Sequence, residues 1–175
     1  MFFSLIRKRR SIRKFKTTRI EKEKVDRLIE AALRAPSSRG LNPWRFIVVD
    51  EPEMLEKMAA SKPHGASFLK NAPLGVVVCA DASKSDVWVE DCSIAAIFIQ
   101  LAAHSLDLGS CWIQIRKRTH NSGDLAETHI QRLLNLPAHM KVASIIALGY
   151  PDENKPPHTE ASLEKDKVFF NRFGS

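Results

Sequence analysis

The chain alternates between segments with apolar residues at helical spacing and short runs that are apolar throughout. In EKEKVDRLIEAALRA (21–35), the apolar residues at three- and four-residue spacing are Val25, Leu28, Ile29, Ala32 and Leu33. This spacing predicts an amphipathic helix that ends before Pro36. Further helices are predicted over residues 2–9, 52–61, 88–106 and 124–134.

Short β-rich or continuously apolar runs between these helices predict strands. They are residues 45–50, 74–81, 110–115 and 141–150. LGVVVCAD at 74–81 is apolar almost throughout, which is typical of a strand covered on both faces. The order of helices and strands predicts an α+β domain with a sheet of four or more strands between helices.

The helix expected at 88–106 lacks a polar side wide enough to face water. Its apolar residues are Trp88, Ile94, Ala95, Ile97, Phe98, Ile99, Leu101, Ala102 and Leu106. A helix that is apolar on nearly all sides is buried on nearly all sides, either in the centre of a core or at a subunit interface. One small domain has difficulty enclosing a helix of this length, so the segment predicts a homodimer.

The length and the chain end bear on domain organisation. At 175 residues the chain is expected to form a single domain, residues 1–175. From Pro151 the sequence becomes polar and rich in proline. Residues 151–175 therefore predict a C-terminal tail that packs on the surface or on a partner subunit.

The net charge of +7 is local, because ten of the 27 lysines and arginines fall within residues 1–24, beside two glutamates. A general nucleic-acid binder is expected to spread a basic stripe across its fold. The charge distribution therefore argues against a nucleic-acid partner. The cations are instead concentrated in one short segment, which indicates a local role for them.

The cysteines, the apolar segments and the histidines each exclude a class of protein or site. Three cysteines without a CxxC pair fit reduced core thiols of a cytoplasmic protein better than disulfides. No secretory leader is visible, and the most apolar segment, 94–103, is about half a membrane-spanning helix, so no membrane partner is expected. The six histidines fall into no metal spacing, and no metal site or catalytic side chain is predicted.

The first candidate stretch is RRSIR, in which Arg9, Arg10 and Arg13 surround the hydroxyl of Ser11. Guanidinium groups match phosphate oxygens bidentately, and a nearby hydroxyl adds a donor. The alternative is a solvated basic turn.

Two further stretches have equally plain structural alternatives. In PSSRGLNPW, the residues from Pro36 to Pro43 fit a turn after a helix end. In LDLGSCWI, Gly109 fits either a helix-capping glycine or a backbone that approaches a flat ligand closely. Neither stretch identifies a function by itself.

Taken together and in order, four stretches resemble the nitroreductase family of FMN-dependent, NAD(P)H-using oxidoreductases. They are RRSIRKF, APSSRGLNPWRFIVV, DCSIAAIFIQLAAHSLDLGSCWI and ALGYPDENKPP. The resemblance runs from about Leu5 to about Leu163. It implies an α+β sandwich with a central mixed or antiparallel sheet flanked by helices, and a homodimer with two flavins at its interface.

The resemblance also implies the cofactor-binding residues. They are Arg9, Arg10, Ser11, Arg13, Pro36, Ser37, Ser38, Gly40, Asn42, Leu108, Gly109 and Ser110. Arg9, Arg10 and Ser11 match the phosphate and ribityl site. Arg13 matches the basic position beside the N1/C2-carbonyl side of the flavin ring, where a cation stabilises the reduced anion. Residues 36–38 match a loop contributed by the partner subunit, and 108–110 match a backbone segment bordering the ring.

Two departures from the family pattern affect details. Gly40 and Asn42 stand where the family usually has Asn and Gln. In the tail, His158 and Glu160 stand where the family commonly has the Lys and Arg that complete the phosphate site. A carboxylate at Glu160 would repel a phosphate. Either the tail runs differently, or Lys155 or the N-terminal arginines carry the extra load.

The activity implied by the resemblance is hydride transfer from NAD(P)H through FMN to a nitroaromatic, a quinone or a related conjugated acceptor. An alternative is an FMN-binding protein that acts as a sensor or as a specialised flavin oxidase or desaturase-like enzyme. A nucleic-acid arm at 7–16 is a further alternative, but only Phe15 interrupts its cations, and it leaves the other motifs unexplained.

Overall fold

A computed structural model describes residues 2–174 and contains one four-stranded sheet with strand order β1-β2-β4-β3. The strands are Trp44–Val49 (β1), Leu74–Asp81 (β2), Gly109–Gln114 (β3) and Met140–Gly149 (β4). Every neighbouring pair is antiparallel. The expected strands are therefore present within one residue at each end, and the sheet is antiparallel rather than mixed.

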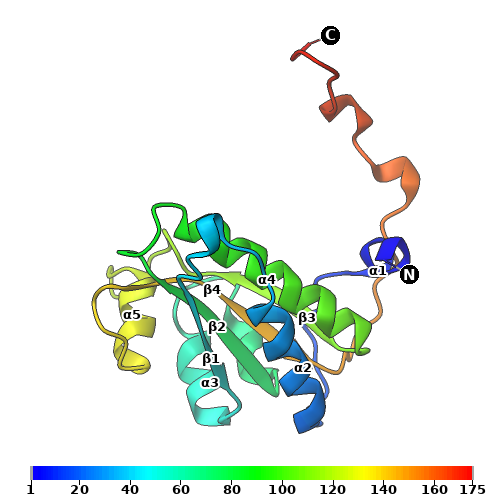
Figure 1. Ribbon diagram of the computed structural model, residues 1–175. Coiled ribbons are helices and arrows are strands. Elements are labelled where there is room, and N and C mark those ends of the chain that lie inside the picture. Colours follow the sequence, from blue (N-terminus) through cyan, green and yellow to red (C-terminus); the bar gives the residue numbers. More distant parts are fainter. Residues whose placement is uncertain (1, 175) are drawn as a thin grey trace.

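Helices cover both faces of this sheet (Figure 1). The helices are Phe2–Lys8 (α1), Lys22–Leu33 (α2), Pro52–Ala59 (α3), Trp88–Ser105 (α4) and Ala126–Leu133 (α5). Helices α2 and α4 lie on one face, α3 and α5 on the other, and α1 lies apart near one end of α4 (Figure 1). Short 3-10 turns occur at Ser38–Gly40, Ser67–Asn71, Glu160–Ser162 and Lys165–Lys167. The expected α+β architecture is confirmed.

The core has two halves, one on each face of the sheet. On one side, Leu28 of α2 and Ile99 of α4 pack against Val78 and Ile146; on the other, Met58 of α3 lies in one cluster with Val77. Strands β2 and β4 form the middle of the sheet and are buried along nearly their whole length. A strand covered on both faces needs apolar side chains at successive positions, which explains the continuous run at 74–81.

Within one chain, α4 is buried on its inner side only, which leaves the expected subunit interface as the remaining way to cover it. Its inner face packs on the sheet, but Ile94, Ile97 and Phe98 on its outer face are 37%, 39% and 36% exposed. The helix is therefore not at the centre of the chain's own core. Leu33, expected on the buried face of α2, is likewise 55% exposed, because that helix turns only Leu28 and Ala32 fully inward.

The basic N-terminal segment runs along one end of the sheet rather than free in solvent. Ser11 forms a parallel bridge with Ser110, and the amide of Ile12 donates to the carbonyl of Ser110 at 3.0 Å. A Cβ on Gly109 would lie 2.9 Å from the Cβ of Ile12. Gly109 is therefore needed so that this segment can lie directly on β3. It is not a helix-capping glycine, since the left-handed residue after α4 is Asp107 (φ 61°).

The tail divides into two parts. Residues 151–155 return along the N-terminal segment, where the amide of Asp152 donates to the carbonyl of Lys14 at 2.9 Å. Beyond them the chain projects away from the sheet (Figure 1), and its apolar side chains are exposed. These are Leu163, Val168, Phe169, Phe170 and Phe173. Packing of this outer part on a partner subunit stays a prediction.

None of the helices within residues 2–174 is both long and apolar enough to cross a membrane.

Candidate functional site

A hollow of about 320 Å³ lies where the N-terminal segment, the end of α4, the start of β3 and residues 151–155 meet. Four cationic side chains line it: Lys8, Arg9, Arg10 and Lys155. We call it the cationic hollow. Leu108, Gly109 and Ser110 form its floor at the start of β3, and these three residues are nearly buried.

Two carboxylates, Asp107 and Glu153, also line the cationic hollow, but Glu153 is already engaged. Its Oε1 accepts from the backbone amides of Arg13 and Lys14 and lies 3.1 Å from the Lys155 ammonium. Burial alone would raise the pKa of Glu153, but these hydrogen bonds lower it overall. Glu153 therefore serves to fix the backbone, and the hollow keeps an excess of positive charge.

Lys155 joins the tail to the N-terminal motif. Its ammonium donates to the carbonyl of Ser11 at 2.7 Å, and Arg10 donates to the carbonyl of Pro156. In contrast, neither His158 nor Glu160 lines the hollow, and the Glu160 carboxylate lies 3.9 Å from Lys165. Of the alternatives raised by the tail sequence, the geometry favours Lys155 as the extra cation.

The buried thiol of Cys111 on β3 reports the field next to the hollow. Burial raises the pKa of this thiol overall, and the charges of Arg13, Lys155 and Arg9 and a hydrogen bond from Ser11 only partly oppose the rise. The charges of these three residues therefore converge on one stretch of β3. Ser11 turns its hydroxyl to this stretch while its backbone holds Lys155.

Arg13 lies at the border of the hollow rather than within it. Its guanidinium is 5.8 Å from the centre of the Phe68 ring. It lines a neighbouring hollow of about 560 Å³ that also contains Asp50 and Asp152 and is therefore of mixed charge. Arg13 thus places a cation next to β3 but outside the set formed by Arg9, Arg10 and Lys155.

The second candidate stretch forms a loop, residues 36–42, whose polar groups bond to one another. The Ser37 hydroxyl donates to the side-chain oxygen Oδ1 of Asn42 at 2.7 Å, and the backbone amide of Asn42 donates to Ser37 Oγ at 2.9 Å. Arg39, Gly40 and Asn42 have φ values of 54°, 64° and 46°. Left-handed conformations at non-glycine residues cost energy and persist only where surrounding contacts impose them. The loop is therefore held in one shape.

Asp91 supplies part of that constraint, and the sequence analysis missed it. This residue is 2% exposed in the first turn of α4. Its Oδ1 accepts from the Ser38 amide at 2.8 Å, and its Oδ2 accepts from the Ser85 hydroxyl at 3.0 Å. A buried carboxylate needs such donors. The available signal was a pair of acids, Glu90 and Asp91, at the start of a largely apolar helix.

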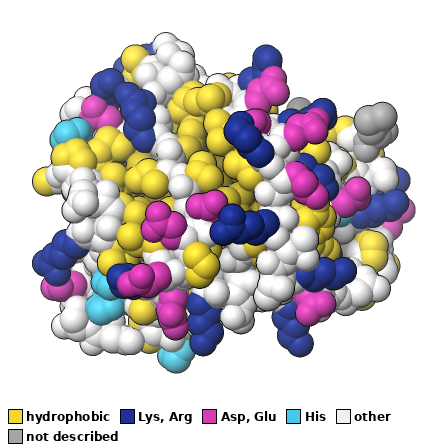
Figure 2. All heavy atoms as spheres, turned by 90° about the horizontal axis from the view of Figure 1, so that it is seen from below, with side chains coloured by type: hydrophobic (Ala, Val, Ile, Leu, Met, Phe, Trp, Pro, Cys, Tyr) yellow, Lys and Arg dark blue, Asp and Glu magenta, His cyan; other side chains and the backbone are white. Residues whose placement is uncertain are grey.

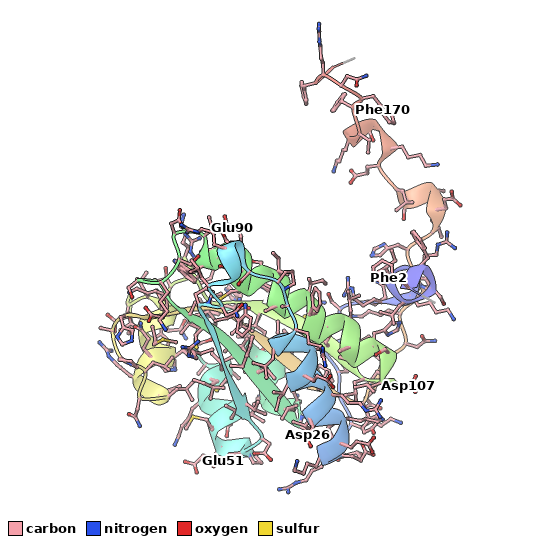
Figure 3. The ribbon with its side chains drawn as sticks, in the orientation of Figure 1. Phe2, Asp26, Glu51, Glu90, Asp107 and Phe170 are labelled. Carbon is pink, nitrogen blue, oxygen red and sulfur yellow. The ribbon has the colours of Figure 1, made fainter. Side chains whose placement is uncertain are left out.

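The two halves of the candidate site lie at opposite ends of α4. Figure 3 shows Glu90 and Asp107 at those two ends, with Phe2 of α1 on the Asp107 side. The thirteen residue-to-residue steps from Asp91 to His104 correspond to roughly 20 Å of helix. Within one chain, the structure therefore brings Arg9, Arg10 and residues 108–110 together, with Ser11 and Arg13 adjoining. Pro36, Ser37, Ser38, Gly40 and Asn42 lie at the far end.

The metal-binding side chains and the rest of the surface are arranged as follows in the part of the chain that the structure describes. Within residues 2–174, no group of three or more metal-binding side chains comes together. On the face seen in Figure 2, apolar side chains gather in the middle, and lysines and arginines alternate with acidic residues around them. That face carries no continuous basic stripe.

Comparisons with known proteins agree with this geometry. The model of the nitroreductase family matches residues 6–64 and 55–150. A solved structure described as an FMN-dependent nitroreductase from Clostridium difficile R20291 is 49% identical and superimposes with a TM-score of 0.96, covering 98% of this chain and 99% of that one.

Two further relatives extend the likeness. A protein of Methanothermobacter thermautotrophicus named "Putative NADH dehydrogenase/NAD(P)H nitroreductase" is 40% identical over 171 residues, covering 96% of this chain and 85% of its own length. A nitroreductase of Desulfitobacterium hafniense DCB-2, solved with bound FMN, is 25% identical with a TM-score of 0.75 and 98% coverage of both chains. The resemblance seen in the four motifs is confirmed, and the chain belongs to the nitroreductase family.

Proposed function

We propose that this protein is an FMN-dependent oxidoreductase that takes electrons from NADH or NADPH and reduces a nitroaromatic, a quinone or a related conjugated acceptor. The observation that carries the proposal is the cationic hollow, because the residues that line it include Arg9 and Arg10 of the family's N-terminal motif. The FMN-dependent and FMN-bound nitroreductases similar to this chain support the same cofactor.

The chemistry of the hollow fits the phosphate of FMN. Arg9, Arg10 and Lys155 offer charged donors, whereas Glu153 is occupied by two backbone amides and Lys155. An excess of cations in a partly enclosed space favours a dianion, and guanidinium donors suit its oxygens. Among residues 2–174 we identify no glycine-rich GxGxxG turn of the kind used for dinucleotides, which favours FMN over FAD.

The protein's own residues bind and orient in this proposal. Arg9, Arg10 and Lys155 hold the phosphate, and Ser11 fixes Lys155 through its carbonyl. Arg13 supplies a cation near the ring side of the site. When bound, FMN supplies the hydride transfer chemistry, so no side chain of the chain is required as a nucleophile or catalytic base.

The complete site requires two chains in this proposal. The 36–42 loop and the cationic hollow lie at opposite ends of α4, and the stripe of Ile94, Ile97 and Phe98 between them is exposed. A second copy packed antiparallel on this stripe would bring its loop to the first copy's hollow. We propose a homodimer with two shared flavin sites, and we propose that the apolar outer tail packs on the partner.

A reducing compartment, the cytoplasm, is part of the proposal. Cys79, Cys92 and Cys111 are all unpaired and buried. Burial raises the pKa of Cys79 to about 11 and that of Cys92 to about 12, so both thiols are protonated and unreactive at neutral pH.

One observation favours the alternative of a specialised flavoprotein. Asn42 stands at a flavin-facing position of the family motif, yet its side chain accepts from Ser37 rather than projecting freely. A loop closed on itself offers fewer groups to an acceptor. A sensor or a flavin oxidase of restricted specificity is therefore the second candidate.

The test begins with purified protein reconstituted with flavin. Mass analysis of the released cofactor is expected to give FMN, and FAD or no flavin would contradict the cofactor assignment. Sedimentation is expected to give twice the 19.7 kDa chain mass.

Anaerobic addition of NADH or NADPH is expected to bleach the bound flavin, and a quinone or nitroaromatic to restore its colour in a separate half-reaction. Steady-state kinetics with both substrates are then expected to be ping-pong. If millimolar NADH and NADPH both leave the flavin oxidised, the reductase assignment fails and the second candidate replaces it.

A further inference from the structure

His104 lies in the last turn of α4 and lines the cationic hollow beside Arg9 and Ser110. No role was predicted for this histidine from the sequence, because it belongs to no metal spacing and lies in an apolar helix. Its side chain is half-buried. The tertiary structure therefore adds to the hollow a titratable group that is absent from the family positions assigned above.

Charged groups face His104 from several elements. Lys8 comes from α1, Arg9 and Arg10 from the segment that follows it, and Asp107 from the turn after α4. The tail contributes Glu153 and Lys155 to the same hollow. Of the two carboxylates, Glu153 is engaged as described above, and Asp107 also interacts with Lys24 of α2. The surroundings of the imidazole are thus cationic on balance.

These surroundings disfavour the charged form of the imidazole in the free protein. Burial, and after it the charge of Arg9, lower the pKa of His104 below its usual 6.5, and Asp107 only partly opposes them. A dianion in the hollow reverses the electrostatic part of this effect, since it offsets Arg9 and Lys8. The carbonyl groups at the C-terminal end of α4 also favour a cation there.

We propose that His104 is a phosphate-responsive positioning residue, which takes up a proton when the FMN phosphate enters the cationic hollow and then adds a further positive group to Lys8, Arg9, Arg10 and Lys155. The inference rests on the proposed function, since FMN is the ligand that brings the dianion. It adds that cofactor binding is coupled to pH through one residue at the end of α4.

The direction of the coupling follows from linkage. The pKa of His104 is higher with FMN bound than in the free protein. FMN affinity therefore increases as the pH falls from the pKa of the bound state towards the pKa of the free protein. Below the free-protein value the gain is complete. Each unit of difference between the two pKa values corresponds to a tenfold gain at most, so we expect about a 3- to 10-fold increase in affinity between pH 8 and pH 6.5.

The test measures FMN binding to the apoprotein by flavin fluorescence quenching from pH 8 to pH 6, for the wild type, His104→Gln and His129→Gln. His129 is the matched control, because it lies on α5 on the other face of the sheet. The phosphate itself gains a proton near pH 6, but this affects all three proteins alike. The wild type and His129→Gln are expected to gain affinity as the pH falls, and His104→Gln is not.

Calorimetry provides a second readout that needs no variant. FMN titrations at pH 7 in two buffers of different ionisation enthalpy give the number of protons bound, and the wild type is expected to take up a fraction of one proton. No proton uptake by the wild type, or the same pH profile in His104→Gln, overturns the inference while leaving FMN binding intact. A wild-type protein that binds no FMN overturns the proposed function as well.

Discussion

The two ends of α4 differ in how their polar and charged groups are paired. At the Asp91 end, polar groups pair within the chain: Ser38 and Ser85 with Asp91, and Ser37 with Asn42. At the His104 end, the cations outnumber the available carboxylates, and Lys155 and Arg10 donate to backbone carbonyls. The polar groups at the Asp91 end are paired within the chain, whereas the His104 end keeps an excess of positive charge.

This difference indicates how binding energy is divided. A loop whose polar groups are already satisfied can present a fixed surface, but it has little left with which to attract a charged ligand. A cluster of cations repels itself until an anion arrives, so it gains most from binding. In the proposed dimer, the 36–42 loop of one chain lies at the cationic hollow of the other.

Breaking the dimer is expected to have the largest effect. Ile97→Glu introduces a charge into the exposed apolar stripe of α4, where burial against a second copy would leave it unpaired. At about 2 kcal/mol for each of two copies, dimer dissociation is expected to become roughly 1,000-fold easier. Sedimentation measures this, and bound flavin is expected to fall in parallel.

The matched control is Val48→Glu, since Val48 is 37% exposed on the edge strand β1 and lies beside Val25 of α2, outside the α4 stripe. It is expected to leave the dimer intact. An Ile97→Glu monomer that keeps its flavin at full occupancy would show that one chain suffices for the site.

The next largest effect concerns the charged end. Arg9→Ala removes a charge-assisted hydrogen bond, which is worth roughly 1.5–3 kcal/mol, so the FMN dissociation constant is expected to rise about 10- to 150-fold. Equilibrium binding to the apoprotein measures it. Arg7→Ala is the control, because Arg7 lies 6.0 Å from the Phe3 ring and does not line the hollow. Equal losses in both variants would mean that the segment binds FMN only through its overall charge.

The Asp91 end of α4 is expected to contribute more to folding stability than to FMN binding. Asp91→Ala leaves the Ser38 amide and the buried Ser85 hydroxyl without their acceptor, which is expected to lower the free energy of unfolding by about 1–3 kcal/mol. Asp91→Asn keeps an acceptor of the same shape and is expected to recover most of this loss. Denaturant unfolding of the apoprotein measures both. If alanine and asparagine destabilise equally, the carboxylate's charge rather than its geometry holds the loop.

The smallest effect is expected at the surface of the same loop. Arg39 pairs with Asp86, but the two side chains are 64% and 78% exposed. Exposed ion pairs contribute little, so Arg39→Ala is expected to change the free energy of unfolding by less than about 1 kcal/mol in the same assay. A larger loss would mean that Arg39 contacts a partner subunit.

Local pattern was sufficient for most of the fold. Spacing and β-rich runs predicted the four strands and five α-helices of residues 2–174 to within about two residues. This was possible because the order of apolar and polar residues within a segment follows the side chains that the segment buries. The 3-10 turn at Ser67–Asn71 was missed, since three residues per turn leave no amphipathic period in so short a segment. The strand order came only from the structure, which also decided between the mixed and the antiparallel sheet that the resemblance left open.

The sequence by itself determined that cations cluster around Ser11 and that this cluster belongs to a nitroreductase motif. Only the tertiary structure decided what completes it. Gly109 leaves room for the side chain of Ile12, and Lys155 donates to the carbonyl of Ser11, 144 positions away in the chain. His104 and Arg9, from two different segments, line the same hollow. Such contacts depend on how the elements pack, and no local period encodes them. The same holds for Asp91, whose donors come from two separate loops, so its role follows from burial rather than from spacing.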